Sequence, residues 1–180
     1  MLGIPCDVKI YNKVINMKNI IKLTSLSLML VSFTTNSAGS TPAPSHDIAY
    51  PVGWQNWSTI AVSHRIDNMT IRTILGNDIA VNAARSGKTN PWPDGSIIGK
   101  VVWKDTELED WKTAIGPGKF VHAEFMFKDS KTYSATFGWG WARWIGLEQK
   151  PFQKGTQVCT SCHLPVKKRD WVYTDIAILP

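Results

Sequence analysis

The sequence predicts an α+β fold: a single domain dominated by an antiparallel β-sheet, with a few short helices. Several segments are rich in β-branched and aromatic residues and show partial two-residue alternation, which is typical of strands. Helical patterns are confined to short stretches, which argues against a helical bundle. The roughly 140 residues from Gly39 onward are enough for one domain with its own hydrophobic core.

The N-terminal residues resemble a secretory signal peptide. A basic stretch at 18–22 precedes an apolar run at 23–33, and small polar residues then lead to Ala38. The run is too short for a membrane span, which needs roughly 20 residues. This order predicts an N-terminal extension and signal peptide over residues 1–38, cleaved near Ala38. An uncleaved anchor is the alternative.

The mature protein would comprise a flexible lead-in, residues 39–49, and a folded domain, residues 50–180. Translation starts at either Met1 or Met17. Cleavage lowers the formal net charge from +6 to about +3, because residues 1–38 hold four Lys and one Asp. We expect no nucleic-acid binding, since the mature chain has no dense basic stripe beyond a short run. The signal predicts a periplasmic protein with no membrane span after cleavage.

Five segments are predicted to be strands. They are residues 58–66, 70–75, 96–104, 120–128 and 131–145. In the third segment the side chains separate into two sets by alternation. One set is Ile97, Gly99, Val101 and Trp103, and the other is Ile98, Lys100, Val102 and Lys104. A lysine among apolar residues is unusual if its face is buried.

Three helical segments are expected. Residues 77–86 are alanine-rich, with Asn77 as a cap and Gly87 as a stop. Residues 107–115 form a second short helix before a Gly-Pro-Gly turn. A final helical turn near the C-terminus carries a cysteine motif.

That motif is the most specific signal in the chain. Cys6 lies in the segment expected to be removed, whereas Cys159 and Cys162 are followed directly by His163, as C-x-x-C-H. Two thiols at this spacing can each add to one vinyl group of the same haem, and the adjacent imidazole can bind its iron. The sequence predicts one haem c per chain, attached through Cys159 and Cys162 with His163 as the axial ligand.

Other sites fit the cysteine pair less well. A structural zinc site needs two further ligands, and His46, His64 and His122 have no ligand partner at short spacing. A thioredoxin-like dithiol would follow an early strand, whereas this pair lies near the C-terminus. Zinc, a dithiol and a plain disulfide stay open as weaker alternatives.

The far side of the haem is expected to be open. No Met or His follows His163, so a second strong iron ligand would come from upstream. The candidates are Met69, Met126, His46, His64 and His122, each more often an ordinary core or surface residue. Five-coordinate iron favours ligand binding or chemistry over pure electron relay. Most of the nine Trp residues are expected in the core, with Trp139 and Trp141 as candidates for a haem-pocket wall.

Short motifs occur in a defined order along nearly the whole mature chain. They are Y-P, G-W and W within 50–57, I-R-T at 71–73, W-P-D-G-S at 92–96, K-D-S at 128–130, C-x-x-C-H, Asp170, and V-Y-T at 172–174. In this order they resemble the cytochrome P460 family and its relative cytochrome c-prime-beta. The resemblance implies a small, β-rich, homodimeric haem protein in the periplasm.

Two further site residues follow from the resemblance. In cytochrome P460 a lysine after a D-G-[ST] turn links to the porphyrin rim, and residues 94–96 followed by Lys100 match that placement. The resemblance implies that Lys100 is cross-linked to haem or contacts it; the alternative is that it faces solvent with Lys104. Arg72 matches a family arginine and is expected near a haem propionate or a distal ligand, with an ordinary structural role as the alternative.

The resemblance also implies an activity. The family oxidises hydroxylamine to nitric oxide or nitrous oxide and passes single electrons to an acceptor cytochrome. Relatives without the cross-link bind nitric oxide or carbon monoxide in an apolar pocket. A haem-dependent oxidoreductase of the hydroxylamine-oxidising type is therefore the leading hypothesis, with a gas-binding protein or a six-coordinate electron-transfer cytochrome as alternatives. No catalytic residue is assigned; Glu124 and Glu148 are candidate distal carboxylates, each more often a surface acid.

Overall fold

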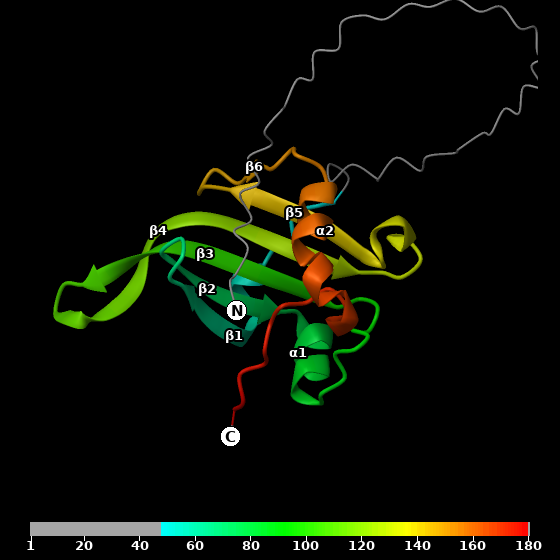
Figure 1. Ribbon diagram of the computed structural model, residues 1–180, viewed down its shortest axis with the longest axis horizontal. Coiled ribbons are helices and arrows are strands. Elements are labelled where there is room, and N and C mark those ends of the chain that lie inside the picture. Colours follow the sequence, from blue (N-terminus) through cyan, green and yellow to red (C-terminus); the bar gives the residue numbers. More distant parts are fainter. Residues whose placement is uncertain (1–47, 180) are drawn as a thin grey trace, which may run out of the picture. The chain divides into compact units, whose positions relative to one another are not determined.

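The computed structural model describes residues 48–179, which form a six-stranded antiparallel sheet and short helices (Figure 1). The strands are β1 (Ser58–Arg65), β2 (Thr70–Gly76), β3 (Ile97–Leu108), β4 (Trp111–Lys128), β5 (Trp139–Ile145) and β6 (Lys150–Pro151). The helices are α1 (Asp78–Arg85) and α2 (Gln157–His163), with 3₁₀ turns η2 (Trp54–Asn56), η3 (Ser134–Thr136) and η4 (Leu164–Arg169). Each strand pairs with its neighbour in sequence. The predicted α+β class is confirmed.

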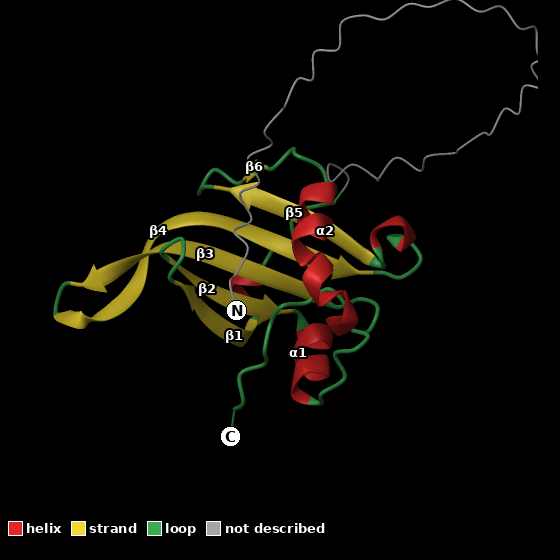
Figure 2. Cartoon of the chain, in the orientation of Figure 1, coloured by secondary structure: helices red, strands yellow, loops and turns green. Residues whose placement is uncertain are grey.

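Different parts of the chain cover the two faces of the sheet. One face, which carries Ile98, Met126 and Trp141, packs against both helices and the segment after η4; Figure 2 shows α1 and α2 on this same side. We call it the helix-covered face. The other face, which carries Phe125 and Trp144, packs against the segment that precedes β1. The two sets predicted for β3 do face opposite sides.

Helix α1 begins where the sequence predicts. The Asn77 side-chain oxygen accepts a hydrogen bond from the Ala80 amide at 3.0 Å, as an N-terminal cap does. The same oxygen accepts one from the Ile97 amide at 3.0 Å, which ties the start of the helix to the start of β3. Gly87, at a φ of +70°, follows the helix end.

The predicted helix at 107–115 is wrong, because these residues form the tip of the β3–β4 hairpin. Glu107 pairs with Ile115 and Leu108 with Trp111, across a turn at residues 109–110. Glu, Leu and Lys favour a helix here, but helix propensity is a weak preference that tertiary pairing overrides. Continuing the ladder from β3 into β4 satisfies the backbone groups instead.

The predicted strand at 131–145 is correct only in its second half. The Asp129 carboxylate accepts hydrogen bonds from the Lys131 and Thr132 amides at 3.0 and 2.9 Å, which closes a turn directly after β4. Phe137 and Gly138 then have positive φ values of 64° and 81°. The backbone therefore becomes extended only at Trp139, where β5 begins.

Several predictions lie outside the described residues. These are the signal peptide at 1–38, both candidate start methionines, Cys6, and most of the lead-in at 39–49. Within the described part, Ile48 and Tyr50 already pack against the sheet. No helix of residues 48–179 has the length and apolar character needed to cross a membrane.

Candidate functional site

The C-x-x-C-H motif occupies helix α2. Gly155, at a φ of +73°, turns the chain just before the helix, and Pro165 follows its end within η4. Cys159 and Cys162 are three residues apart, which places both on one side of the helix. Cys159 packs against the core of the helix-covered face, and burial raises the pKa of its thiol. The fold thus presents the predicted attachment residues from one short element.

The loop after η4 orients His163. Its Nδ1 lies 2.6 Å from the Trp171 carbonyl oxygen. A carbonyl only accepts, so Nδ1 carries the proton and Nε2 keeps its lone pair, which is the tautomer of a metal ligand. Burial lowers the pKa of His163, which keeps the imidazole neutral. Trp141 and Tyr173 meet the imidazole edge to face, with ring centroids 4.7 and 5.2 Å away.

A row of charged side chains crosses three adjacent strands of the helix-covered face. Lys100 on β3 pairs in register with Glu124 on β4, which pairs with Arg143 on β5. Glu124 forms an ion pair with Lys100 and accepts a hydrogen bond from Arg143 Nε at 2.5 Å. The Glu124 side chain is only 16% exposed. We call these three residues the charged row.

Burial and the neighbouring charges together fix the protonation states of Glu124 and His122. Burial alone would raise the pKa of the Glu124 carboxyl, but the charges of Lys100 and Arg143 outweigh burial and hold this pKa well below its usual range. His122 Nε2 lies 3.7 Å from Glu124 Oε2. Burial lowers the pKa of His122 to about 4. At neutral pH, an ionised carboxylate therefore stands beside a neutral imidazole.

The charged row faces the C-x-x-C-H helix. All three of its charges act on the pKa values of Cys159 and His163. Trp141, two residues before Arg143 on β5, contacts the imidazole directly. Lys100 therefore lies on the same side of the sheet as the motif, with a side chain 28% exposed. Lys104, further along β3, is exposed and donates to a backbone carbonyl at 3.0 Å.

Two buried donors on this face have no acceptor within the described residues. They are Arg72 Nε on β2 and Trp141 Nε1 on β5. A buried donor without a partner costs about 1–3 kcal/mol, which a bound group with acceptor atoms would relieve. Haem has two propionate carboxylates. The residue types present fit haem: two cysteines for its vinyl groups, an imidazole for its iron and two donors for its carboxylates.

Other residues singled out in the sequence lie elsewhere. Met69 and His64 are exposed on or beside β1 and β2, and Glu148 is exposed after β5. Met126 is buried in the core of the helix-covered face, beside the charged row on β4. His46 lies outside the described residues.

Sequence reasoning missed Arg143 and named Glu124 only as a candidate distal carboxylate that is more often a surface acid. The signal for Arg143 was the alternation on β5, where Trp139, Trp141 and Arg143 share one side. Nothing local marked Glu124, because its role depends on a lysine and an arginine from neighbouring strands.

We expect His122→Gln to weaken the pH dependence of stability between about pH 4 and 6.5. In this window the unfolded imidazole is protonated, whereas the buried one, with a pKa near 4, is not. The unfolded state then binds more protons, so lowering the pH destabilises the wild type by up to ~1.4 kcal/mol per pH unit. Urea unfolding across the window measures the slope. Exposed His64→Gln is the matched control, and an unchanged slope in His122→Gln would rule out a buried neutral imidazole.

Comparison with known proteins identifies the family of this chain. The family model described as Cytochrome P460 matches residues 51–174. The matched range includes every strand, both helices, the charged row and the C-x-x-C-H motif. No curated protein matches the chain. Because the family model covers well over half of the sequence, and its members carry haem, the chain belongs to the cytochrome P460 family of haem proteins.

Proposed function

We propose that this protein is a periplasmic mono-haem c-type cytochrome that oxidises hydroxylamine, or a related small nitrogen compound, in one-electron steps. Cys159 and Cys162 would hold the haem covalently, and His163 would be its axial ligand. The observation that carries the proposal is the charged row facing the helix of this motif. We also propose, on family grounds alone, a homodimer and an acceptor cytochrome as electron partner.

The side chains around the charged row suit a polar substrate. Glu124 is ionised and accepts hydrogen bonds, so it can orient a small molecule that carries N–H or O–H groups. Oxidation of hydroxylamine releases protons as well as electrons. His122 Nε2, unprotonated at neutral pH and 3.7 Å from the Glu124 carboxylate, can accept a hydrogen bond from the substrate group that loses a proton. A bound haem supplies the one-electron acceptor.

The alternative of gas binding is less well supported. A pocket for nitric oxide or carbon monoxide needs an apolar lining and none of these charges. Three charged side chains and a histidine on the surface beneath α2 favour a ligand that donates and accepts hydrogen bonds.

We expect Lys100→Ala to change the spectrum and the activity together. If Lys100 is bonded to the porphyrin rim, the wild type has a strongly red-shifted ferrous Soret band, and the variant has that of an ordinary five-coordinate haem c. Hydroxylamine oxidation with a one-electron acceptor should fall at least tenfold, because the variant loses both the haem link and a cation of the charged row. Intact mass and optical spectra of the two periplasmic proteins measure the haem content and the position of the Soret band.

Lys104→Ala is the matched control, since it removes an exposed lysine from the same side of the same strand. It should keep the wild-type spectrum and turnover. If wild type and Lys100→Ala share one ordinary haem c spectrum, Lys100 acts only through its ion pair. If haem-loaded wild type turns over no hydroxylamine, the proposed activity is wrong and gas binding becomes the better hypothesis.

A further inference from the structure

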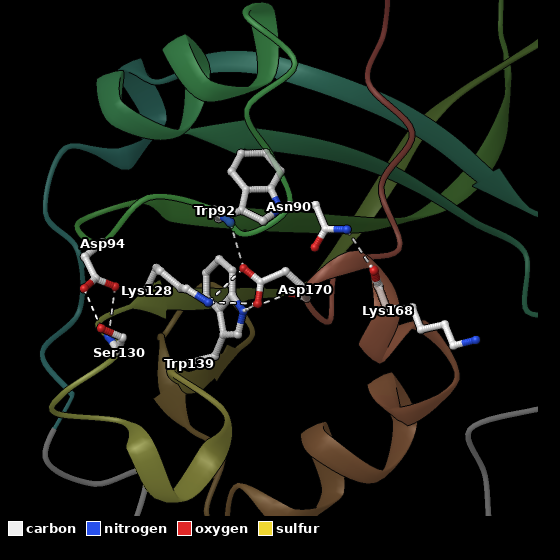
Figure 3. Close-up of polar contacts among 8 residues, drawn as sticks. All are labelled: Asn90, Trp92, Asp94, Lys128, Ser130, Trp139, Lys168 and Asp170. Atoms are coloured by element: carbon white, nitrogen blue, oxygen red, sulfur yellow. Dashed lines mark hydrogen bonds and ion pairs between the residues drawn. The ribbon is translucent and has the colours of Figure 1, made fainter.

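A buried ion pair joins the end of β4 to the loop that follows η4. Lys128 Nζ lies 2.8 Å from both carboxylate oxygens of Asp170, and the two side chains are only 7% and 10% exposed (Figure 3). Burying two charges is costly unless their remaining hydrogen-bonding capacity is satisfied. The pair lies outside the charged row and is not used by the proposed chemistry.

Asp170 is held by further contacts from two other segments. Its Oδ2 accepts a hydrogen bond from the Trp92 amide at 2.8 Å. The Trp139 indole N–H lies 2.9 Å from the Asp170 carbonyl oxygen and 3.3 Å from Oδ1. Lys128 Nζ also sits over the Trp139 ring, 4.9 Å from its centroid. Side chain and backbone of Asp170 are therefore both fixed, as Figure 3 shows.

The backbone at this point adopts a conformation that needs support. Asp170 and Trp171 have φ values of 48° and 67°, so two consecutive non-glycine residues are left-handed. Such residues cost about 1–3 kcal/mol each and persist only where surrounding contacts determine them. The Trp171 ring stacks on Phe137, with centroids 4.1 Å apart. The result of this turn is that the Trp171 carbonyl points at His163 Nδ1, 2.6 Å away.

We propose that the Lys128–Asp170 pair is a positioning device for the axial histidine. It holds the left-handed turn, and the turn aims the Trp171 carbonyl that accepts the Nδ1–H of His163. This inference rests on the proposal that His163 binds the haem iron. A strong hydrogen bond from Nδ1–H makes the imidazole a better donor to iron and favours the ferric state. Without the ion pair the turn relaxes and the hydrogen bond weakens. The ferrous state then becomes more stable relative to the ferric state.

Removing a charge near the haem also changes the reduction potential, whatever happens to the turn. The variants must therefore separate a change of charge from a change of geometry. Asp170→Asn removes a negative charge, which by itself raises the reduction potential. The double variant Lys128→Met with Asp170→Asn removes both charges and leaves the net charge as in the wild type. It also avoids an unpaired buried charge, which keeps the fold accessible. Asp175→Asn is the control, because it breaks an exposed ion pair with Arg169 in the same segment.

The readouts are the ferrous iron–histidine stretching frequency, by resonance Raman, and the reduction potential of the haem-loaded protein. We expect a lower frequency and a higher potential in Asp170→Asn and in the double variant, and wild-type values in Asp175→Asn. A wild-type frequency and potential in the double variant would overturn the inference and leave only an electrostatic effect. Failure of the parent proposal is seen separately: wild type would then show no covalent haem or no iron–histidine band.

Discussion

Replacing both Cys159 and Cys162 with serine is expected to abolish covalent haem attachment. A hydroxyl does not add to a haem vinyl group under the conditions in which a thiol does, so no thioether forms. Both cysteines lie on one side of α2, next to the axial candidate His163. Haem staining of a denaturing gel and intact mass measure the loss, which should be complete. Haem that remains bound should be extracted by acidified solvent.

Cys6→Ser is the matched control for that experiment. Cys6 lies in the predicted signal segment, outside the described residues, and its replacement should leave haem attachment unchanged. Cys159→Ser alone should leave a single thioether, visible as a shifted pyridine haemochrome band. Covalent haem in the double variant, or its loss in Cys6→Ser, would contradict attachment through α2.

Local patterns in the sequence were sufficient for the features that depend on one element. The cap at Asn77, the stop at Gly87 and the helical turn carrying C-x-x-C-H are all local, and the structure has them. Alternation on β3 correctly placed Lys100 with Ile98 and Val102 on one face. The alternation did not predict the ion-pair partner of Lys100, because Glu124 reaches Lys100 only through the pairing of β3 with β4.

Features that depend on pairing at a distance were missed. The tip of the β3–β4 hairpin has helix-favouring residues, and only its register with the partner strand makes it extended. Lys128 and Asp170 both occur in the motifs that carry the family resemblance, yet they are 42 residues apart. Their contact requires the end of β4 and the loop after η4 to meet. No periodicity within either segment contains that information.

Lys128→Met is expected to destabilise the protein by about 3–5 kcal/mol, the usual effect of removing one partner from a buried ion pair. Asp170 would keep its hydrogen bonds from the Trp92 amide and the Trp139 indole, but its carboxylate would be buried without a cation. Urea unfolding of the haem-loaded protein at neutral pH measures the effect. An unchanged slope of the unfolding free energy against urea concentration would confirm that variant and wild type expose the same surface area on unfolding.

Two comparisons identify the lone carboxylate as the cause. Arg169→Met breaks an exposed pair with Asp175, whose side chain is 90% exposed, and should cost at most about 1 kcal/mol. The double variant Lys128→Met with Asp170→Asn should recover most of the stability, because it leaves no buried charge. The loss in Lys128→Met should also shrink as the pH falls, since an unpaired buried carboxyl takes up a proton more readily than one in water. A loss of equal size in the single and double variants would instead assign the effect to packing of the lysine stem.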